Sequence, residues 1–133
     1  MFKEEKLLKL LFGGAYNGKL KYVREKLGIN EEEIFYCKED SIDFSKKVIS
    51  GIDRLIYFNA LQGKESLSFF KEKKELLKDK ILICDEISSG IVPLKKEERL
   101  WREETGKVLQ FLSKESEEVY RIFFGIPTKL KDE

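Results

Sequence analysis

The residues best suited to chemistry form a glycine-rich stretch near the N-terminus, GGAYNGKL at positions 13–20. Phosphate-binding loops follow the pattern Gly, four residues, Gly, Lys and then Ser or Thr. Gly13, Gly18 and Lys19 match it, and Leu20 stands where the hydroxyl residue belongs. Glycines let successive backbone N–H groups approach an anion, and the lysine adds positive charge for the outer phosphates. The sequence therefore predicts phosphate binding by Gly13, Gly14, Ala15, Tyr16, Asn17, Gly18, Lys19 and Leu20.

Leu20 limits what this loop is expected to do. Its backbone N–H can still donate to phosphate, but its side chain cannot bind Mg²⁺, which requires oxygen ligands. Nucleotide binding is thus better supported than nucleotide turnover. The alternative is an ordinary strand–turn–helix connection that uses glycine for its turn.

A second group of candidate functional residues is Asp85 and Glu86, which directly follow the apolar residues 81–84. Nucleotide hydrolases present a magnesium-linked Asp and a water-activating Glu in this way, beside the phosphate loop. We therefore expect Asp85 and Glu86 to bind Mg²⁺, and Lys19 and Glu86 to be the catalytic residues. Two acids that only mark where a buried strand meets solvent explain the same pattern equally well.

Composition removes several other classes of function. The 26 basic and 25 acidic side chains of the 133 residues are interleaved and leave a formal charge of +1, which gives no footprint for nucleic acid or an anionic membrane. No apolar run reaches signal-peptide or membrane-spanning length, so we expect a cytoplasmic protein. Histidine is absent, which excludes histidine metal ligands and Ser-His or Cys-His nucleophile pairs. Cys37 and Cys84 are expected to be small buried hydrophobes.

Hydrophobic periodicity predicts alternating strands and helices, and hence a mainly parallel sheet of about five strands with helices on both faces. The expected architecture is a three-layer α/β fold like that of P-loop NTPases, in a single domain over residues 1–133. Residues 129–133 are expected to form a loose tail. The expected strands are 7–12, 34–37, 54–58, 81–84 and 119–124, and the expected helices are 20–27, 44–52, 66–78 and 95–114.

The segment DEISSGIVP at residues 85–93 resembles the Asn-Glu-Val-Gly-x-Gly-Ile-Val-Pro signature of the bifunctional adenosylcobinamide kinase / adenosylcobinamide-phosphate guanylyltransferase family. GGAYNGK resembles the family's Gly-Gly-Ala-Arg-Ser-Gly-Lys-Ser loop. Arg99, Trp101-Arg102 and Gly106 resemble its Arg-x-Phe-Arg-Asp-x-x-Gly helix, and Gly125 through Lys131 resembles its ending. The resemblance implies a GTP- or ATP-binding homo-oligomer of cobalamin biosynthesis that acts on a corrinoid.

Three functional groups of that family are absent. Its Arg-Ile-x-x-His helix, whose histidine accepts the guanylyl group, has no counterpart here. RLIYFN resembles its Val-Leu-Val-Asp-Cys-Leu-Thr strand, with Phe58 and Asn59 standing where an acid is expected. Leu20 replaces the loop serine. We therefore expect a nucleotide-binding protein in which guanylyl transfer is lost and kinase activity is doubtful.

Two alternatives stay open. The chain could be an active adenosylcobinamide kinase or small NTPase that uses Lys19, Asp85 and Glu86, with Asp85 compensating for the missing acid. It could instead be a non-catalytic oligomeric interaction module in which aromatic side chains such as Tyr16, Tyr22 and Trp101 form a subunit contact.

Overall fold

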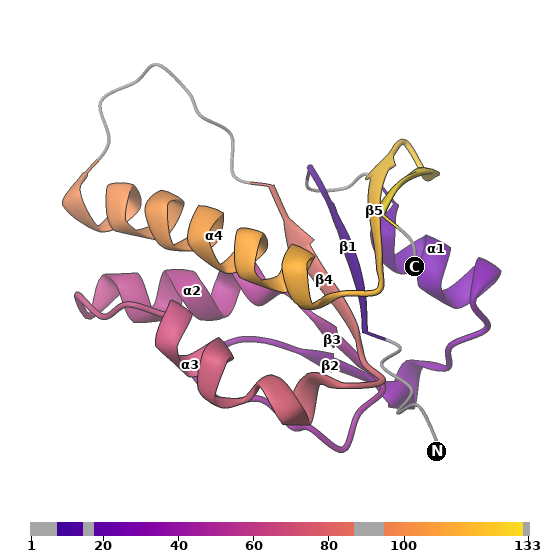
Figure 1. Cartoon of the computed structure of the whole chain (residues 1–133), viewed down its shortest axis with the longest axis horizontal. Helices are drawn as coiled ribbons and strands as arrows, with labels where there is room; N and C mark the ends of the chain where they lie inside the picture. The colour runs from indigo at the N-terminus through magenta and orange to yellow at the C-terminus, as the bar shows by residue number, and fades with distance from the viewer. Residues whose placement is uncertain (1–7, 15–17, 87–94, 132–133) are drawn as a thin grey trace.

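A computed structural model describes residues 8–14, 18–86 and 95–131. They form one six-stranded sheet in the order β2-β3-β4-β1-β5-β6, with helices on both faces (Figure 1). The strands are β1 Lys9–Gly13, β2 Ile34–Tyr36, β3 Val48–Ser50, β4 Ile81–Asp85, β5 Glu118–Phe123 and β6 Ile126–Lys131. The helices are α1 Lys19–Lys26, α2 Ile52–Leu61, α3 Leu67–Glu72 and α4 Lys96–Glu115, with 3₁₀ turns at Glu31–Glu33 and Lys74–Leu77.

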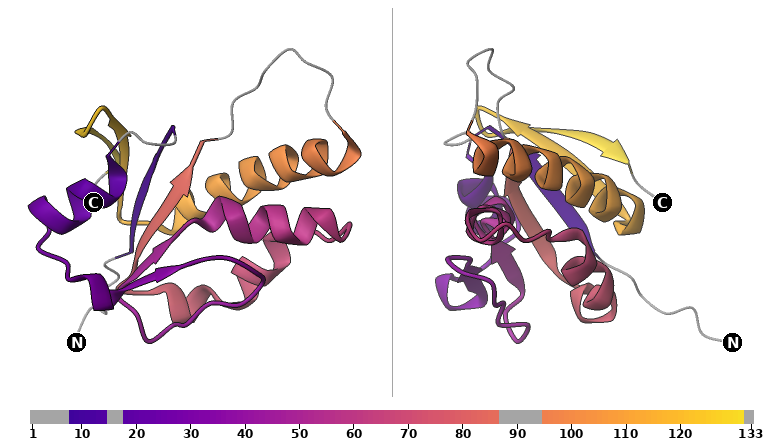
Figure 2. Two further views of the ribbon diagram at one scale, coloured as in Figure 1. Left: turned by 180° about the vertical axis from the view of Figure 1, so that it is seen from behind. Right: turned by 90° about the vertical axis from the view of Figure 1, so that its left-hand side faces the viewer.

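The two faces of the sheet carry separate hydrophobic clusters, because successive side chains of a strand point to opposite faces. In the central strand β1, Leu10 belongs to the cluster that includes residues of α2, α3 and α4. Leu11 belongs to the other cluster, which includes Val23 of α1. Figure 2 shows α2, α3 and α4 on one side of the sheet and α1 on the other. The predicted three-layer α/β fold is therefore confirmed.

The first five strands pair in parallel, and β6 pairs antiparallel with β5. A parallel sheet brings the carboxyl ends of its strands to one edge, where ligands bind in folds of this type. Here that edge carries the loop after β1, the residues after β2 and β3, and Asp85 at the end of β4.

The predicted strand at 54–58 is wrong, because these residues lie within α2. The β-branched and aromatic string RLIYF favours a strand, but burial follows a helical spacing. The fully or almost fully buried side chains of Ile52, Leu55, Ile56 and Ala60 are 3, 1 and 4 positions apart, which places them on one helix face against the sheet.

The predicted helix at 44–52 is also wrong. Val48, Ile49 and Ser50 are all buried and form β3, which pairs with β2 on one side and β4 on the other. A central strand of a parallel sheet is covered on both faces, so it lacks the polar alternation that identifies a strand in a sequence. Gly51, with φ 82°, then turns the chain directly into α2.

The C-terminal region forms a hairpin. Residues 129–131, which were expected to belong to a loose tail, lie in β6. The turn at Phe124 and Gly125 has positive φ at both residues, as tight hairpins require. The sheet consequently has six strands rather than about five.

The remaining helix predictions are closer to the structure. The long helix is confirmed as α4, with Val108 and Leu112 fully buried. The single helix expected at 66–78 is divided into α3 and a 3₁₀ turn. In the described part of the chain, no helix is long and apolar enough to cross a membrane.

Candidate functional site

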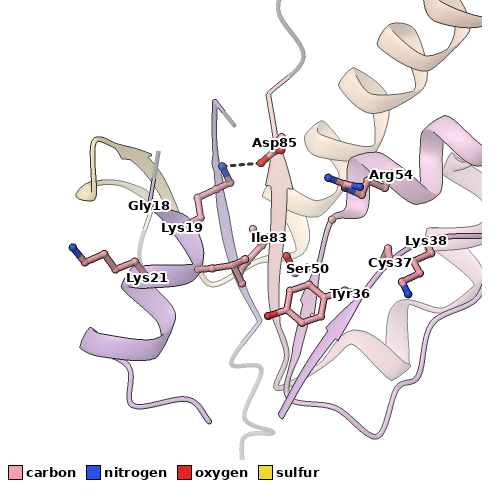
Figure 3. A pocket seen from close by; sticks show the side chains of 12 residues that line it. Gly18, Lys19, Lys21, Tyr36, Cys37, Lys38, Ser50, Arg54, Ile83 and Asp85 are labelled. Atoms are coloured by element: carbon pink, nitrogen blue, oxygen red, sulfur yellow. Dashed lines mark ion pairs between the residues drawn. The ribbon is translucent and has the colours of Figure 1, made fainter. Parts of the chain in front are cut away.

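A pocket of about 630 Å³ opens at the carboxyl edge of the sheet, between α1 on one side and the residues after β2 and β3 on the other (Figure 3). Its volume is within the range of small-molecule sites. Four of its lining side chains are basic and one is acidic. The lining residues are Gly18, Lys19, Leu20, Lys21, Tyr36, Cys37, Lys38, Ser50, Gly51, Arg54, Ile83 and Asp85.

Lys19 lies at the start of α1 and is only 5% exposed. Its amino group donates to the carbonyl oxygens of Gly13 and Gly14, at 3.3 and 2.7 Å. It also forms an ion pair of 2.7 Å with Oδ1 of Asp85. The three donors of an ammonium group are matched by these three acceptors. The structure thus brings together Lys19 of the loop and Asp85 of β4, 66 positions apart in the chain.

The glycines of the loop are also required by the fold. A Cβ atom on Gly13, which has φ 151°, would lie 2.4 Å from the carbonyl oxygen of Ile122 in β5. Gly18, with φ 87°, precedes α1 in the left-handed conformation and lies close to Gly125 of the hairpin turn. These two glycines therefore have a packing reason to be glycine beside any role toward phosphate. Ala15, Tyr16 and Asn17 lie outside the described residues.

Leu20 is half-buried, and its side chain packs in the cluster beneath α1 as well as lining the pocket. It offers the pocket no oxygen atom.

Glu86 is adjacent to the loop but is held by another residue. Its backbone N–H donates to the carbonyl oxygen of Gly13 at 2.7 Å. Its carboxylate accepts two hydrogen bonds from Arg121 of β5, at 2.8 and 3.3 Å. A bidentate arginine pair of this kind fixes the orientation of the carboxylate. Glu86, predicted to be catalytic and to bind Mg²⁺, therefore lies at the edge of the site with its oxygens engaged.

Asp53 is a site residue that the sequence interpretation missed. It lies in the first turn of α2, is 6% exposed, and its Oδ1 accepts the backbone N–H of Asp85 at 2.9 Å. Burial, and to a lesser degree the negative charge of Asp85, raise the pKa of the Asp53 carboxyl. Trp101 of α4 donates its indole N–H to the backbone carbonyl of Asp53 at 2.9 Å. The one signal in the sequence is that Asp53 is the first acid after the largely apolar residues 48–52, which form too short a strand to be identified from the sequence.

Phe58 and Asn59, which were matched to the acid of a family strand, are therefore not strand residues. Phe58 and Asn59 are in α2, and the buried amide of Asn59 donates to Oγ of Ser66. The strand that ends beside β4 is Val48–Ser50, and the nearest acid after it is Asp53.

A family model described as cobinamide kinase / cobinamide phosphate guanyltransferase matches residues 57–130, more than half of the chain. The chain belongs to this family. A search of curated proteins finds no match to the chain.

The family match runs from within α2 to β6 and includes Asp85 and Glu86, whereas the glycine loop and Asp53 precede it. Of the residues that carry the family resemblance, 87–93 lie outside the described residues. Trp101, in contrast, is placed behind the site through its bond to Asp53. The family assignment and the loop geometry are thus independent observations.

Lys129 and Lys131, in the segment that resembles the family's ending, both contact other parts of the fold. Lys129 lies over the ring of Tyr120, with 5.5 Å from its Nζ to the ring centroid. Lys131 donates to the carbonyl oxygens of Ser113 and Lys114 at 2.9 Å each, and so satisfies free carbonyls at the end of α4.

The residues expected to hold Mg²⁺ are both paired with cations, Asp85 with Lys19 and Glu86 with Arg121. Within the described residues, no group of three or more acidic or cysteine side chains is arranged to hold a metal ion. Cys37 and Cys84 are free and buried, as expected, and burial raises the pKa of both thiols, that of Cys37 to about 12. Neither thiol is therefore available as a thiolate near neutral pH.

Proposed function

We propose that this member of the cobinamide kinase / cobinamide phosphate guanyltransferase family binds a nucleoside triphosphate, GTP or ATP, with its phosphates on residues Gly13–Leu20. The observation that carries the proposal is the buried Lys19 amino group at the pocket wall, which is paired with Asp85 and with two loop carbonyls. A lysine buried at the start of a helix is costly unless paired, and phosphate oxygens are the natural replacement for these acceptors.

Binding in this pocket would exchange one set of acceptors for another. The phosphate oxygens would take the Lys19 amino group from Asp85, so the carboxylate of Asp85 would be released toward the pocket. Mg²⁺ keeps most of its water and binds proteins through one or two carboxylates together with substrate phosphates. Asp85 would therefore be the residue that meets a nucleotide-bound Mg²⁺, and Glu86 would join it only by leaving Arg121. The metal would supply charge neutralisation at the phosphates.

The sequence has no histidine to accept a guanylyl group, so we propose that guanylyl transfer is lost in this chain. Kinase activity toward a corrinoid is the second candidate function, and the observation that favours it is the carboxylate pair of Asp53 and Asp85 at the strand edge. Phosphate transfer to cobinamide that is abolished in Lys19→Met and Asp85→Asn would support it, and absence of product at saturating nucleotide would count against it.

Nucleotide binding is tested by calorimetry with GTP and ATP, each with and without Mg²⁺. Lys19→Met keeps the apolar stem and removes the charge, and should weaken binding by about tenfold or more, the usual loss when a hydrogen bond to a charged group is removed. Lys26→Ala, at the other end of α1 and outside the pocket lining, is the control and should bind as the wild type does. The proposal fails if the wild-type protein binds neither nucleotide, or if a folded Lys19→Met binds with unchanged affinity.

A further inference from the structure

The positive charges of the pocket fall into two groups that differ in how they are partnered. Lys19 is neutralised by Asp85. The other three basic lining residues, Lys21, Lys38 and Arg54, have no ion pair within the described chain, and Asp85 is the one acid in the lining. The pocket lining is therefore net positive, and its cations without an ion pair are residues other than the loop lysine.

Arg54 is the unpaired cation best placed to meet a ligand. Figure 3 shows its guanidinium pointing from α2 toward Asp85, on the opposite side of that carboxylate from Lys19, whereas Lys21 and Lys38 extend away from it. The stem of Arg54 lies over the backbone of Gly51, where an added Cβ would be 3.5 Å from its Cδ. The charge of Arg54 opposes the rise in the pKa of Asp53, but the two side chains form no ion pair, and the buried Asp53 carboxylate accepts the backbone N–H of Asp85.

Guanidinium groups are always charged near neutral pH and bind phosphate through two parallel N–H donors. A phosphate that approaches Lys19 has to break an ion pair of 2.7 Å, whereas one that approaches Arg54 breaks none. A net positive pocket wall also concentrates anions. The α2 side of the pocket should consequently accept an anion more readily than the loop side.

We propose that Arg54 anchors a second phosphate subsite in this pocket, separate from the loop and formed at the ends of β3 and β4. The ligand chemistry is a phosphate group, from either of two sources: a phosphorylated molecule bound beside the nucleotide, or a phosphate of the nucleotide itself. This proposal rests on the proposed function only in naming a nucleotide as the ligand of the adjacent loop. Phosphate binding at Arg54 does not require that loop to be occupied.

The direct test is a titration of the full chain with inorganic phosphate, in which backbone amide shifts are measured by NMR. Chloride at matched ionic strength is the reference. Shifts are expected at Gly51 and Arg54, and Arg54→Gln should weaken this binding by about tenfold, the loss usual for a hydrogen bond between charged groups. Lys71→Gln, on α3 and outside the lining, removes one positive charge elsewhere and should leave the phosphate affinity unchanged. Absence of shifts at Gly51 and Arg54, or equal affinity in a folded Arg54→Gln, overturns the subsite.

Two further arms distinguish the sources and separate this inference from nucleotide binding. In Lys19→Met the phosphate shifts at Gly51 should persist, so the subsite survives even where the loop proposal fails; their loss would show that the anion was bound by the loop and overturn the inference. With saturating GTP or ATP present, phosphate shifts that remain identify a separate phosphorylated ligand. Shifts displaced by the nucleotide, with weaker nucleotide binding in Arg54→Gln, identify a phosphate of the nucleotide.

Discussion

Two buried carboxylates, Glu104 of α4 and Asp53 of α2, have environments that differ in almost every respect. Glu104 is 1% exposed, and its Oε1 accepts the backbone N–H groups of Ser66 and Leu67, at 2.8 and 3.2 Å, where α3 begins. Its Oε2 is 3.4 Å from the amino group of Lys107. Among the described residues, Asp53 accepts one backbone N–H from another residue, that of Asp85, whose carboxylate lies nearby.

The two pKa values move in opposite directions as a result. Burial opposes ionisation of Glu104, but the N–H groups of Ser66 and Leu67 and the charge of Lys107 outweigh it and lower the pKa. Burial and the charge of Asp85 raise the pKa of Asp53. A buried acid whose charge is fully compensated stabilises the fold, whereas one kept under-compensated beside a pocket is typical of a functional site.

Glu104→Ala should have the largest effect on stability. It leaves two backbone N–H groups at the start of α3 without an acceptor in a buried place, which should reduce the free energy of unfolding by about 3 kcal/mol. Urea denaturation at pH 7 measures the loss. A reduction near zero would show that Glu104 does not stabilise the contact between α4 and α3.

Glu104→Gln is the matched control, because its amide oxygen can still accept both N–H groups. It should cost about 1 kcal/mol at pH 7, since only the charge is lost. The native pKa of Glu104 lies below its ordinary value of 4.5, so its ionic contribution is complete above that value and disappears as the pH falls through the lowered native pKa. The difference between the wild type and Glu104→Gln should therefore shrink in acid.

The part of the fold that the sequence could predict is the part with long or strongly marked patterns. The twenty-residue helix α4 has a clear apolar stripe, and the first strand, glycine loop and helix have a motif with fixed spacing. Parallel strands bring their carboxyl ends to one edge, so the meeting of Lys19 and Asp85 followed from the predicted topology.

The errors arise where elements are short or depend on a distant partner. β3 has three residues, too few for alternation to be read, and its identity as a strand depends on pairing with β2 and β4. The prediction of a helix at 44–52 and a strand at 54–58 then obscured Asp53, because its place in the site depends on the first turn of α2 lying against β4. The exposed strand β6 is likewise specified by its hairpin turn and by β5 rather than by its own pattern.

The contact between Trp101 and Asp53 should have an intermediate effect. Trp101→Phe removes the indole N–H that donates to the backbone carbonyl of Asp53, and the smaller ring can still pack against Tyr57, whose ring centroid is 4.7 Å away. The free energy of unfolding should fall by about 1 kcal/mol, the usual net value of one hydrogen bond. Tyr57→Phe, which keeps that ring contact, should change it much less. A loss in Trp101→Phe no larger than that in Tyr57→Phe would show that the bond to Asp53 does not hold α4 at the site.

Asp53→Asn should have the smallest effect on stability and the opposite sign. The native pKa of Asp53 lies above its ordinary value of 3.8, so the native state binds the proton more tightly than the unfolded chain. Its ionisation therefore reduces stability as the pH rises from 3.8 through the raised native value. Asparagine keeps an oxygen for the N–H of Asp85 and carries no charge. The variant should be slightly more stable than the wild type at pH 7 and equally stable below pH 3.8.

An exposed aspartate supplies the contrast for this experiment. The hydroxyl and N–H of Ser45 lower the pKa of Asp43, so Asp43→Asn should reduce stability at pH 7 rather than increase it, and the reduction should vanish in acid. Urea denaturation of both variants at pH 7 and at a pH below the lowered native pKa of Asp43 compares the two signs directly. If Asp53→Asn is instead less stable than the wild type at pH 7, the Asp53 carboxylate is fully compensated in the folded chain, as Glu104 is, and its burial beside Asp85 is a property of the fold alone.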